Sequence, residues 1–257
     1  MDFREVLGLP HEKRILEVAA VTHHWVLFCG PGPGRDLAQA VADMEGLPFV
    51  AVDPQTPDPV EAIEDAQEGI LYLDQIERCA WETLEAIFAQ ASSVMVIGRG
   101  DTCPCGKWGV EGARCLCAVD ALREHYRRVY RIAEYFDLVA QLPAQGWRDL
   151  QQRPEDQEPA SAIRRRVEAA RAVVVAHQPT WREGIAHDVY ALLEAATRVL
   201  GLTLEQRDRI LRVARSVAAL EGDGTPRPYH VSEALQYSLG FFRRSRGFTL
   251  PSAEVQA

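Results

Sequence analysis

The fold is decided by residues 25–37, which read Trp-Val-Leu-Phe-Cys-Gly-Pro-Gly-Pro-Gly-Arg-Asp-Leu. The first five residues form a continuous apolar run, the pattern of a strand in a sheet that is buried on both faces. A glycine-rich turn and a helical pattern to about Glu45 follow. Strand, turn and helix in this order are what a phosphate-binding loop requires, because backbone N–H groups and a helix N-terminus favour an anion. We therefore expect an α/β domain with a parallel sheet.

This turn departs from the pattern of a working phosphate loop. In G-x-x-x-x-G-K-[ST] the lysine contacts the terminal phosphates and the hydroxyl ligates magnesium. Here Gly30, Gly32 and Gly34 are followed by Arg35 and Asp36, and the loop is shorter by a residue. A negative charge at Asp36, in the first turn of a helix, would repel phosphate. The turn is therefore either structural or a weak nucleotide site in which Arg35 replaces the lysine.

The rest of the chain divides into two halves. Further strands are expected at residues 49–53, 69–74, 94–98 and 136–142, with helical patterns between them, whereas residues 161–240 read as helices throughout. Thr203 and Gln206 form a capping box that opens one of these helices. We predict an α/β core at 1–144, a polar, proline-bearing linker at 145–160, a helical C-terminal domain at 161–240 and a tail at 241–257.

A cysteine-rich segment follows the strand expected at 94–98. Four of the six cysteines lie there as two Cys-x-Cys pairs, Cys103 with Cys105 and Cys115 with Cys117. Four thiolates can surround a structural zinc ion, and a metal would order a loop too polar to fold by apolar burial. Reduced thiols or a labile disulfide are the alternatives.

These features resemble the ComM/YifB branch of the magnesium-chelatase subunit I family, which are AAA+ ATPases. The resemblance is carried by the cysteine segment, by residues 66–75 (Ala-Gln-Glu-Gly-Ile-Leu-Tyr-Leu-Asp-Gln) and by the helical segments 209–218 and 229–237. It implies a P-loop-type parallel sheet with helices on both faces, followed by an all-α lid. It also implies assembly into an oligomer or with a protein partner, as in AAA+ rings.

The resemblance also assigns roles at a nucleotide site. Asp74 stands where an aspartate holds magnesium, and Asp101 stands at or beside a polar sensor position. Gln75 occupies the place of the general base, and an amide cannot act as a base. Tyr135 stands at the inter-subunit arginine, and Glu205 at an arginine that senses the terminal phosphate. The implied nucleotide-binding set is Gly30, Gly32, Gly34, Arg35, Asp36, Asp74, Asp101 and Glu205.

Substitutions in every catalytic role indicate a degenerate member of the family, a non-hydrolysing assembly or interaction module with weak or absent binding of ATP and magnesium. The alternative is an active ATPase in DNA processing, similar to ComM-like branch migration in natural transformation. Magnesium insertion into porphyrin is the least favoured function, since the branch of the family that performs it lacks the cysteine pairs.

The composition of the chain limits the classes of binding partner that we expect. The net charge is −9, so the surface as a whole does not attract nucleic acid. The helix expected at 118–131 carries Arg123, Arg127, Arg128 and Arg131, either a nucleic-acid patch or a solvated or subunit-facing helix side. Since no apolar run approaches the roughly 18 residues of a membrane span and the first residues do not read as a signal peptide, we expect a cytoplasmic protein with no membrane contact.

Overall fold

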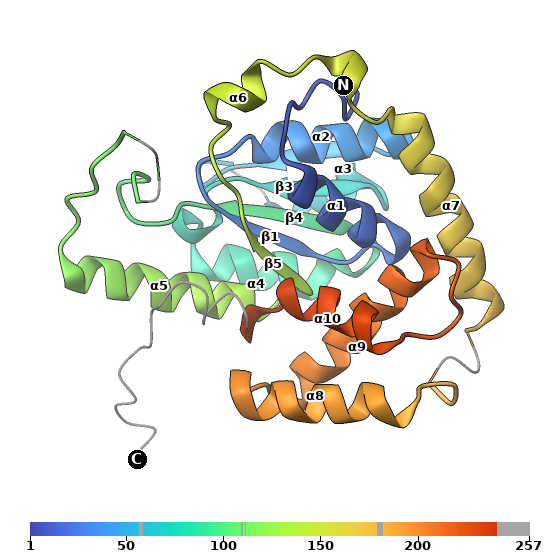
Figure 1. Ribbon diagram of the computed structural model, residues 1–257. Helices are drawn as coiled ribbons and strands as arrows, with labels where there is room; N and C mark the ends of the chain where they lie inside the picture. The colour runs from blue at the N-terminus through green and yellow to red at the C-terminus, as the bar shows by residue number, and fades with distance from the viewer. Residues whose placement is uncertain (57–58, 109, 111, 179–181, 241–257) are drawn as a thin grey trace.

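The computed structural model describes residues 1–56, 59–108, 110, 112–178 and 182–240. Its centre is a five-stranded sheet in the order β2-β3-β4-β1-β5, with every neighbouring pair parallel (Figure 1). The strands are β1 (Val26–Cys29), β2 (Phe49–Val52), β3 (Ile70–Leu73), β4 (Met95–Gly100) and β5 (Leu138–Gln141). The expected parallel α/β sheet is confirmed. Strand β4 extends beyond the apolar run, so that Arg99 pairs in register with Phe28 of β1.

Helices cover both faces of the sheet because successive strand residues point to opposite sides. Val26 and Phe28 face a first core, which is covered by α1 (Pro10–Thr22) and α2 (Gly34–Glu45). Leu27 and Cys29 face a second core under α3 (Pro59–Ala66), α4 (Trp81–Gln90) and α5 (Val119–Ala133). Strands β1 and β3 are buried throughout, as their apolar runs predict, whereas the first three residues of the edge strand β2 are half-buried.

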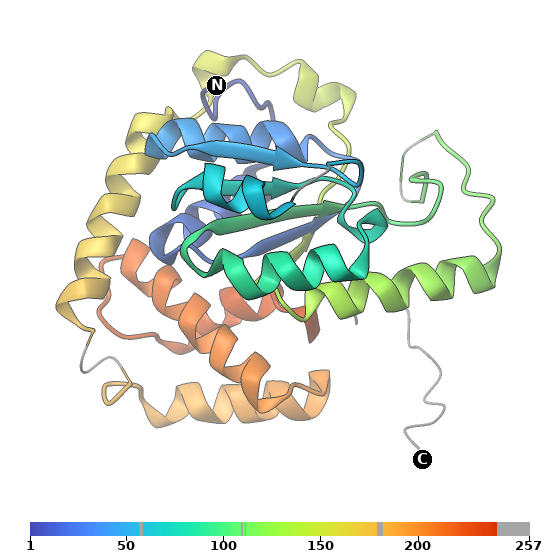
Figure 2. The ribbon, with the colours of Figure 1, turned by 180° about the vertical axis from the view of Figure 1, so that it is seen from behind.

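The C-terminal half is helical, as expected, and comprises α7 (Ala160–Ala176), α8 (His187–Leu200), α9 (Leu204–Leu220) and α10 (Pro228–Gln236). The predicted capping box of Thr203 and Gln206 is present at the start of α9. These helices pack on the α1 side of the sheet, and the first core continues into them (Figures 1 and 2). The connection before α7 contains a short helix, α6 (Trp147–Leu150), and a 3₁₀ turn, Pro154–Asp156.

The cysteine segment between β4 and α5 lies at the opposite end of the sheet from α7 (Figure 1). The predicted tail at 241–257 lies outside the described residues. Among the residues that the structure describes, no helix is long and apolar enough to cross a membrane.

Candidate functional site: a phosphate-type loop closed by an arginine

The predicted nucleotide site lies at the carboxyl ends of three neighbouring strands. Gly30 follows β1, Asp74 follows β3 and Asp101 follows β4. In parallel α/β sheets this edge is where ligands bind. The structure brings the three residues together, and a fourth side chain joins them.

That side chain is Arg99, the penultimate residue of β4, and it extends into the centre of the site. Its Nε donates to the carbonyl oxygen of Gly30 at 3.1 Å. Its Nη1 donates to Asp74 Oδ1 at 3.1 Å and its Nη2 to Asp101 Oδ1 at 2.7 Å. Burial opposes the charged form, but the two carboxylates outweigh it and raise the pKa of Arg99. The two carboxylates that would meet a magnesium ion therefore share a cation of the chain itself.

The loop after β1 is closed by its own backbone hydrogen bonds. The N–H of Gly30 donates to Gly100 O at 2.9 Å, that of Gly32 to Leu142 O at 3.3 Å, and that of Gly34 to Gly32 O at 2.9 Å. Gly30 has a φ of 152°, and a Cβ there would lie 2.0 Å from Leu142 O. The glycines thus let the loop lie against the chain after β5, and these three N–H groups are not free to cradle a phosphate.

The residues around Arg99 complete the closure. Tyr72 donates its hydroxyl hydrogen to Asp74 Oδ1 at 3.1 Å, and burial raises the pKa of Tyr72 well above its usual range. A Cβ on Gly34 would lie 3.0 Å from the same hydroxyl oxygen and 3.3 Å from Arg99 Cβ. Arg35 and Asp36 are exposed in the first turn of α2. The two carboxylates are therefore contacted by Arg99 and Tyr72, and Asp101 also by Arg78, whose Nη2 lies 3.6 Å from its Oδ2.

Gln75 directly follows Asp74, at the start of a 3₁₀ turn, Ile76–Arg78. Its φ of 45° lies in the left-handed region, which residues other than glycine seldom adopt. The structure therefore places the predicted general-base position at the site, on a sharply turning backbone.

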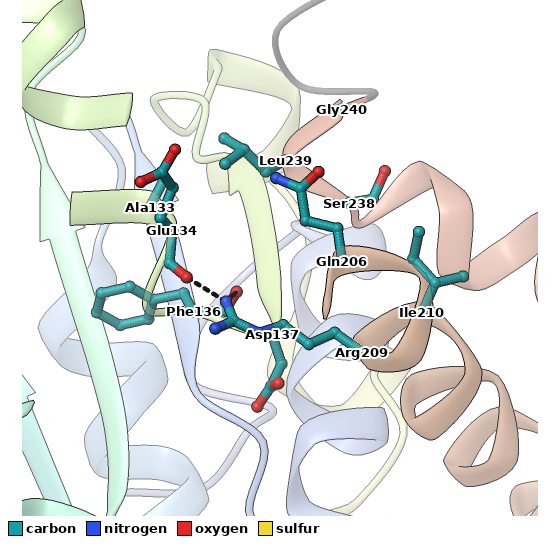
Figure 3. Close-up of a pocket in the computed structure, with 10 residues that line it drawn as sticks. All are labelled: Ala133, Glu134, Phe136, Asp137, Gln206, Arg209, Ile210, Ser238, Leu239 and Gly240. Carbon is teal, nitrogen blue, oxygen red and sulfur yellow. Dashed lines mark hydrogen bonds between the residues drawn. The ribbon is translucent and has the colours of Figure 1, made fainter. Parts of the chain in front are cut away.

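Glu205 lies apart from this site. It is exposed at the start of α9 and pairs with Arg209, which also donates to the carbonyl oxygens of Glu134 and Phe136 (Figure 3). These carbonyls precede β5, so Glu205 is at the amino-terminal edge of the sheet. The pocket here has a volume of about 20 Å³. One water molecule needs about 10–15 Å³, so the pocket holds little more than one. Tyr135, nearby, stacks on Phe88 at 4.2 Å between ring centroids.

The predicted cysteine cluster is assembled. The four Sγ atoms of Cys103, Cys105, Cys115 and Cys117 all lie within 4.8 Å of one another. Three separations are 3.4 Å (Cys103–Cys105), 3.7 Å (Cys105–Cys115) and 3.7 Å (Cys103–Cys115). Thiolates at the corners of a tetrahedron with metal–sulfur bonds of about 2.3 Å are about 3.8 Å apart. The cluster can therefore hold a tetrahedral metal ion.

Backbone N–H groups contact two of the four sulfur atoms; the pKa of Cys105 is lowered, whereas burial raises that of Cys103 and the hydrogen bond with Cys105 raises that of Cys117. The N–H of Trp108 donates to Cys103 Sγ at 3.3 Å. The backbone N–H of Lys107 is the main cause that lowers the pKa of Cys105, to about 6. Cys103 is fully buried and belongs to the second core, which anchors the cluster to α5.

Asp101 connects the cysteine segment to the loop site. Its N–H donates to Glu77 Oε2 at 3.3 Å, and its carbonyl oxygen is 2.8 Å from His125 Nε2. Burial raises the pKa of Glu77 and lowers that of His125, so His125 is neutral at neutral pH and donates to this carbonyl. Sequence reasoning missed Arg99, Glu77 and His125. The signal for Arg99 is a charged residue between Gly98 and Gly100 in an otherwise apolar strand.

The arginines of α5 all have partners within the chain. Arg123 pairs with Asp120 and Arg127 with Glu124. Arg128 donates to the carbonyl oxygens of Glu77 and Cys79, and the Arg131 guanidinium lies 3.6 Å from the centroid of the Trp81 ring. Arg128 and Arg131 therefore join α5 to the region around α4, which favours a structural role over a nucleic-acid patch.

A second group of possible metal ligands, Glu221, Asp223 and His230, lies between α9 and α10. The Nδ1 of His230 accepts the N–H of Arg227 at 3.0 Å, so the neutral ring carries its proton on Nε2. That proton is donated to Glu221 Oε2 at 3.1 Å. A metal would need the lone pair of Nε2, so this group serves to join the two helices.

Comparison with known proteins supports the fold and the C-terminal half. Residues 157–238 match the family model described as magnesium chelatase, subunit ChlI C-terminal. A crystal structure of a candidate ATPase from Cytophaga hutchinsonii is similar over 95% of this chain and 87% of that chain, with a TM-score of 0.55 and 13% sequence identity. The chain resembles the magnesium chelatase subunit I-like AAA+ proteins. No curated protein sequence matches it.

The family expected from the sequence is therefore supported, and the AAA+ fold with a helical C-terminal domain is confirmed. The ComM branch stays a prediction. At 13% identity the structural likeness establishes the architecture alone, so activity has to be argued from the residues of this chain.

Proposed function

We propose that this magnesium chelatase-like chain is a non-hydrolysing AAA+ relative that acts as an assembly module, with copies of itself or with related chains. The observation that carries the proposal is Arg99, which binds Gly30, Asp74 and Asp101 together. A nucleotide with magnesium would have to displace this guanidinium from two carboxylates and a carbonyl oxygen.

The remaining catalytic roles also lack suitable groups. Hydrolysis of a phosphoanhydride needs a group that positions the attacking water, a metal ion and cations at the phosphates. Gln75 cannot act as a base, Asp74 is engaged by Arg99 and Tyr72, and Arg35 is an exposed arginine in place of the compact lysine of a phosphate loop. Asp36, in the first turn of α2, adds a repulsive charge.

For the cysteine cluster we propose a structural zinc ion held by Cys103, Cys105, Cys115 and Cys117. Four thiolate ligands fill a tetrahedral zinc and leave no open position for substrate or water, which is the arrangement of structural sites. The zinc would fix the segment between β4 and α5.

Calorimetry with ATP and magnesium tests whether the chain binds nucleotide, and an assay of released phosphate tests whether it hydrolyses ATP. We expect affinity no better than high micromolar to millimolar and no phosphate release, because each 1.4 kcal/mol of repulsion or lost contact weakens binding about tenfold. Low-micromolar affinity with turnover would instead support the active DNA-processing ATPase.

Sedimentation of the purified chain tests assembly separately. We expect oligomers whose size does not change when ATP is added, because the site is already closed. The matched control is the triple variant Arg99→Ala, Arg35→Lys and Asp36→Thr, in which nucleotide binding should improve. A chain that stays monomeric at all concentrations, alone and mixed with related chains, would refute the assembly role.

A further inference from the structure

A second cavity lies at the junction of the two halves, far from Arg99. Its volume is about 260 Å³, and it is bordered by α1, by residues 157–158 and by the first half of α7. Such a volume is many times that needed for a water molecule, about 10–15 Å³, and is slightly below the usual range of ligand pockets, about 300–1,000 Å³. Pro10 and Ile163 supply apolar parts of its wall.

Four of the charged groups around the cavity balance one another. Arg14 pairs with Glu17 at 3.2 Å, and Arg166 pairs with the same carboxylate. Arg166 also donates to both carboxylate oxygens of Glu158, at 2.7 and 3.0 Å. Arg14 reaches further, to Glu233 of α10, at 2.9 Å. Among the residues that line the cavity, Glu17 and Glu158 therefore balance the charges of Arg14 and Arg166, while Glu233, which pairs with Arg14 from outside the lining, adds a further negative charge.

Lys13 is the remaining cation. Among the described residues its ammonium group has no carboxylate within 4 Å, and its hydrogen-bond partner is the neutral Gln157 Oε1 at 3.3 Å. Burial lowers the pKa of Lys13, and the charge of Asp2, which pairs with Arg4, partly opposes this shift. Lys13 therefore borders the cavity as a partly desolvated positive charge whose hydrogen-bonding capacity is incompletely used.

We propose that this cavity binds a small molecule that carries a carboxylate or a phosphate group, with Lys13 as the counter-ion of that group. A charge-assisted hydrogen bond to an oxyanion is stronger than the present bond to an amide. The molecule would contact α1 of the core together with residues 157–158 and α7, and so would hold the two halves in their present arrangement. This proposal does not depend on the state of the nucleotide site.

The composition of the chain allows a direct test, because Lys13 and Lys107 are its only lysines. Reductive methylation with ¹³C-formaldehyde keeps the positive charge and gives separate NMR signals for the two lysines and for the α-amino group of Met1. A Lys107→Gln variant assigns the Lys107 signal, and the lower pKa of an α-amino group identifies that of Met1. Phosphate and citrate are then added to the whole chain at constant ionic strength. We expect a saturable shift of the Lys13 signal and none of the Lys107 signal. A response to phosphate alone indicates phosphate esters, and a response to citrate alone indicates carboxylates.

Two variants make the test decisive. Gln157→Glu places a carboxylate beside Lys13 and should weaken binding of either anion by about tenfold or more, while Lys13 stays in place. Lys13→Gln should abolish the thermal stabilisation that the anion gives to the unmethylated protein. The proposal is overturned if neither anion shifts the Lys13 signal, if Lys107 responds equally, or if Gln157→Glu binds as tightly as the wild type.

Discussion

Replacing Arg99 with methionine tests the central feature of the loop site. Methionine keeps an unbranched side chain of similar reach but removes the charge. Asp74 then loses its ion-pair partner, and Asp101 keeps only Arg78, whose Nη2 lies 3.6 Å from Asp101 Oδ2. The Arg99 side chain is 15% exposed and that of Asp101 is 10% exposed, so this pair is poorly screened by water. The Asp74 side chain is 40% exposed, and solvent reduces its share of the effect.

The expected cost follows from these exposures. Removing one partner of a buried ion pair costs about 3–5 kcal/mol, and with the screening at Asp74 we expect a loss of about 2–4 kcal/mol in the free energy of unfolding. Unfolding in urea measures it. Magnesium should stabilise the variant more than the wild type, because only in the variant does Asp74 lack an ion-pair partner while Asp101 keeps the exposed Arg78 alone. At ten times its dissociation constant the metal would restore about 1.4 kcal/mol.

Arg123→Met is the matched control. Arg123 forms an exposed pair with Asp120 one helical turn away, so its loss should change stability by less than about 0.5 kcal/mol. The reasoning is refuted if Arg99→Met costs no more than this control, or if magnesium stabilises the variant and the wild type equally.

Three further predictions concern the surroundings of this site. Metal analysis of the wild type should find close to one zinc per chain. Cys105→Ser should weaken zinc binding with the fold intact. Cys103→Ser should also lower the melting temperature, because Cys103 is fully buried. Burial raises the folded-state pKa of Glu77, so the stability that its protonated form contributes is lost as the pH rises. Glu77→Gln should therefore gain stability relative to the wild type from about pH 4.3 upward; urea midpoints that stay parallel across pH would contradict this. Filter binding at physiological salt should show no submicromolar affinity for DNA, and Arg127→Ala should change nothing, since the net charge is −9 and the α5 arginines are engaged within the chain.

The sequence was a good guide wherever a local pattern determines the structure. The apolar run before Gly30 had to become a buried strand, the spacing of the four cysteines predicted the cluster, and Thr203 with Gln206 predicted a helix start. These features depend on neighbouring residues, so periodicity and spacing are sufficient to predict them.

The closure of the loop site could not be predicted in this way. Arg99 meets Gly30 and Asp74 only after three strands have paired, and the bonds span 69 and 25 residues along the chain. The position of Glu205 depends on how the C-terminal helices dock, which no local pattern encodes. The loss of catalytic groups stays a prediction from the sequence, and no local pattern indicated that Arg99 would contact Gly30, Asp74 and Asp101.

The continuity of the first core has a mechanical consequence. Arg171 of α7 donates to the carbonyl oxygen of Ala20 at 2.6 Å and pairs with Glu45 at the end of α2, while Ser216 of α9 contacts His24 at 2.9 Å. The C-terminal helices cannot swing against the sheet without opening apolar surface and breaking these bonds. The two halves therefore move as one rigid body. In an assembly, a displacement of one half by a neighbouring chain would displace the other half as well.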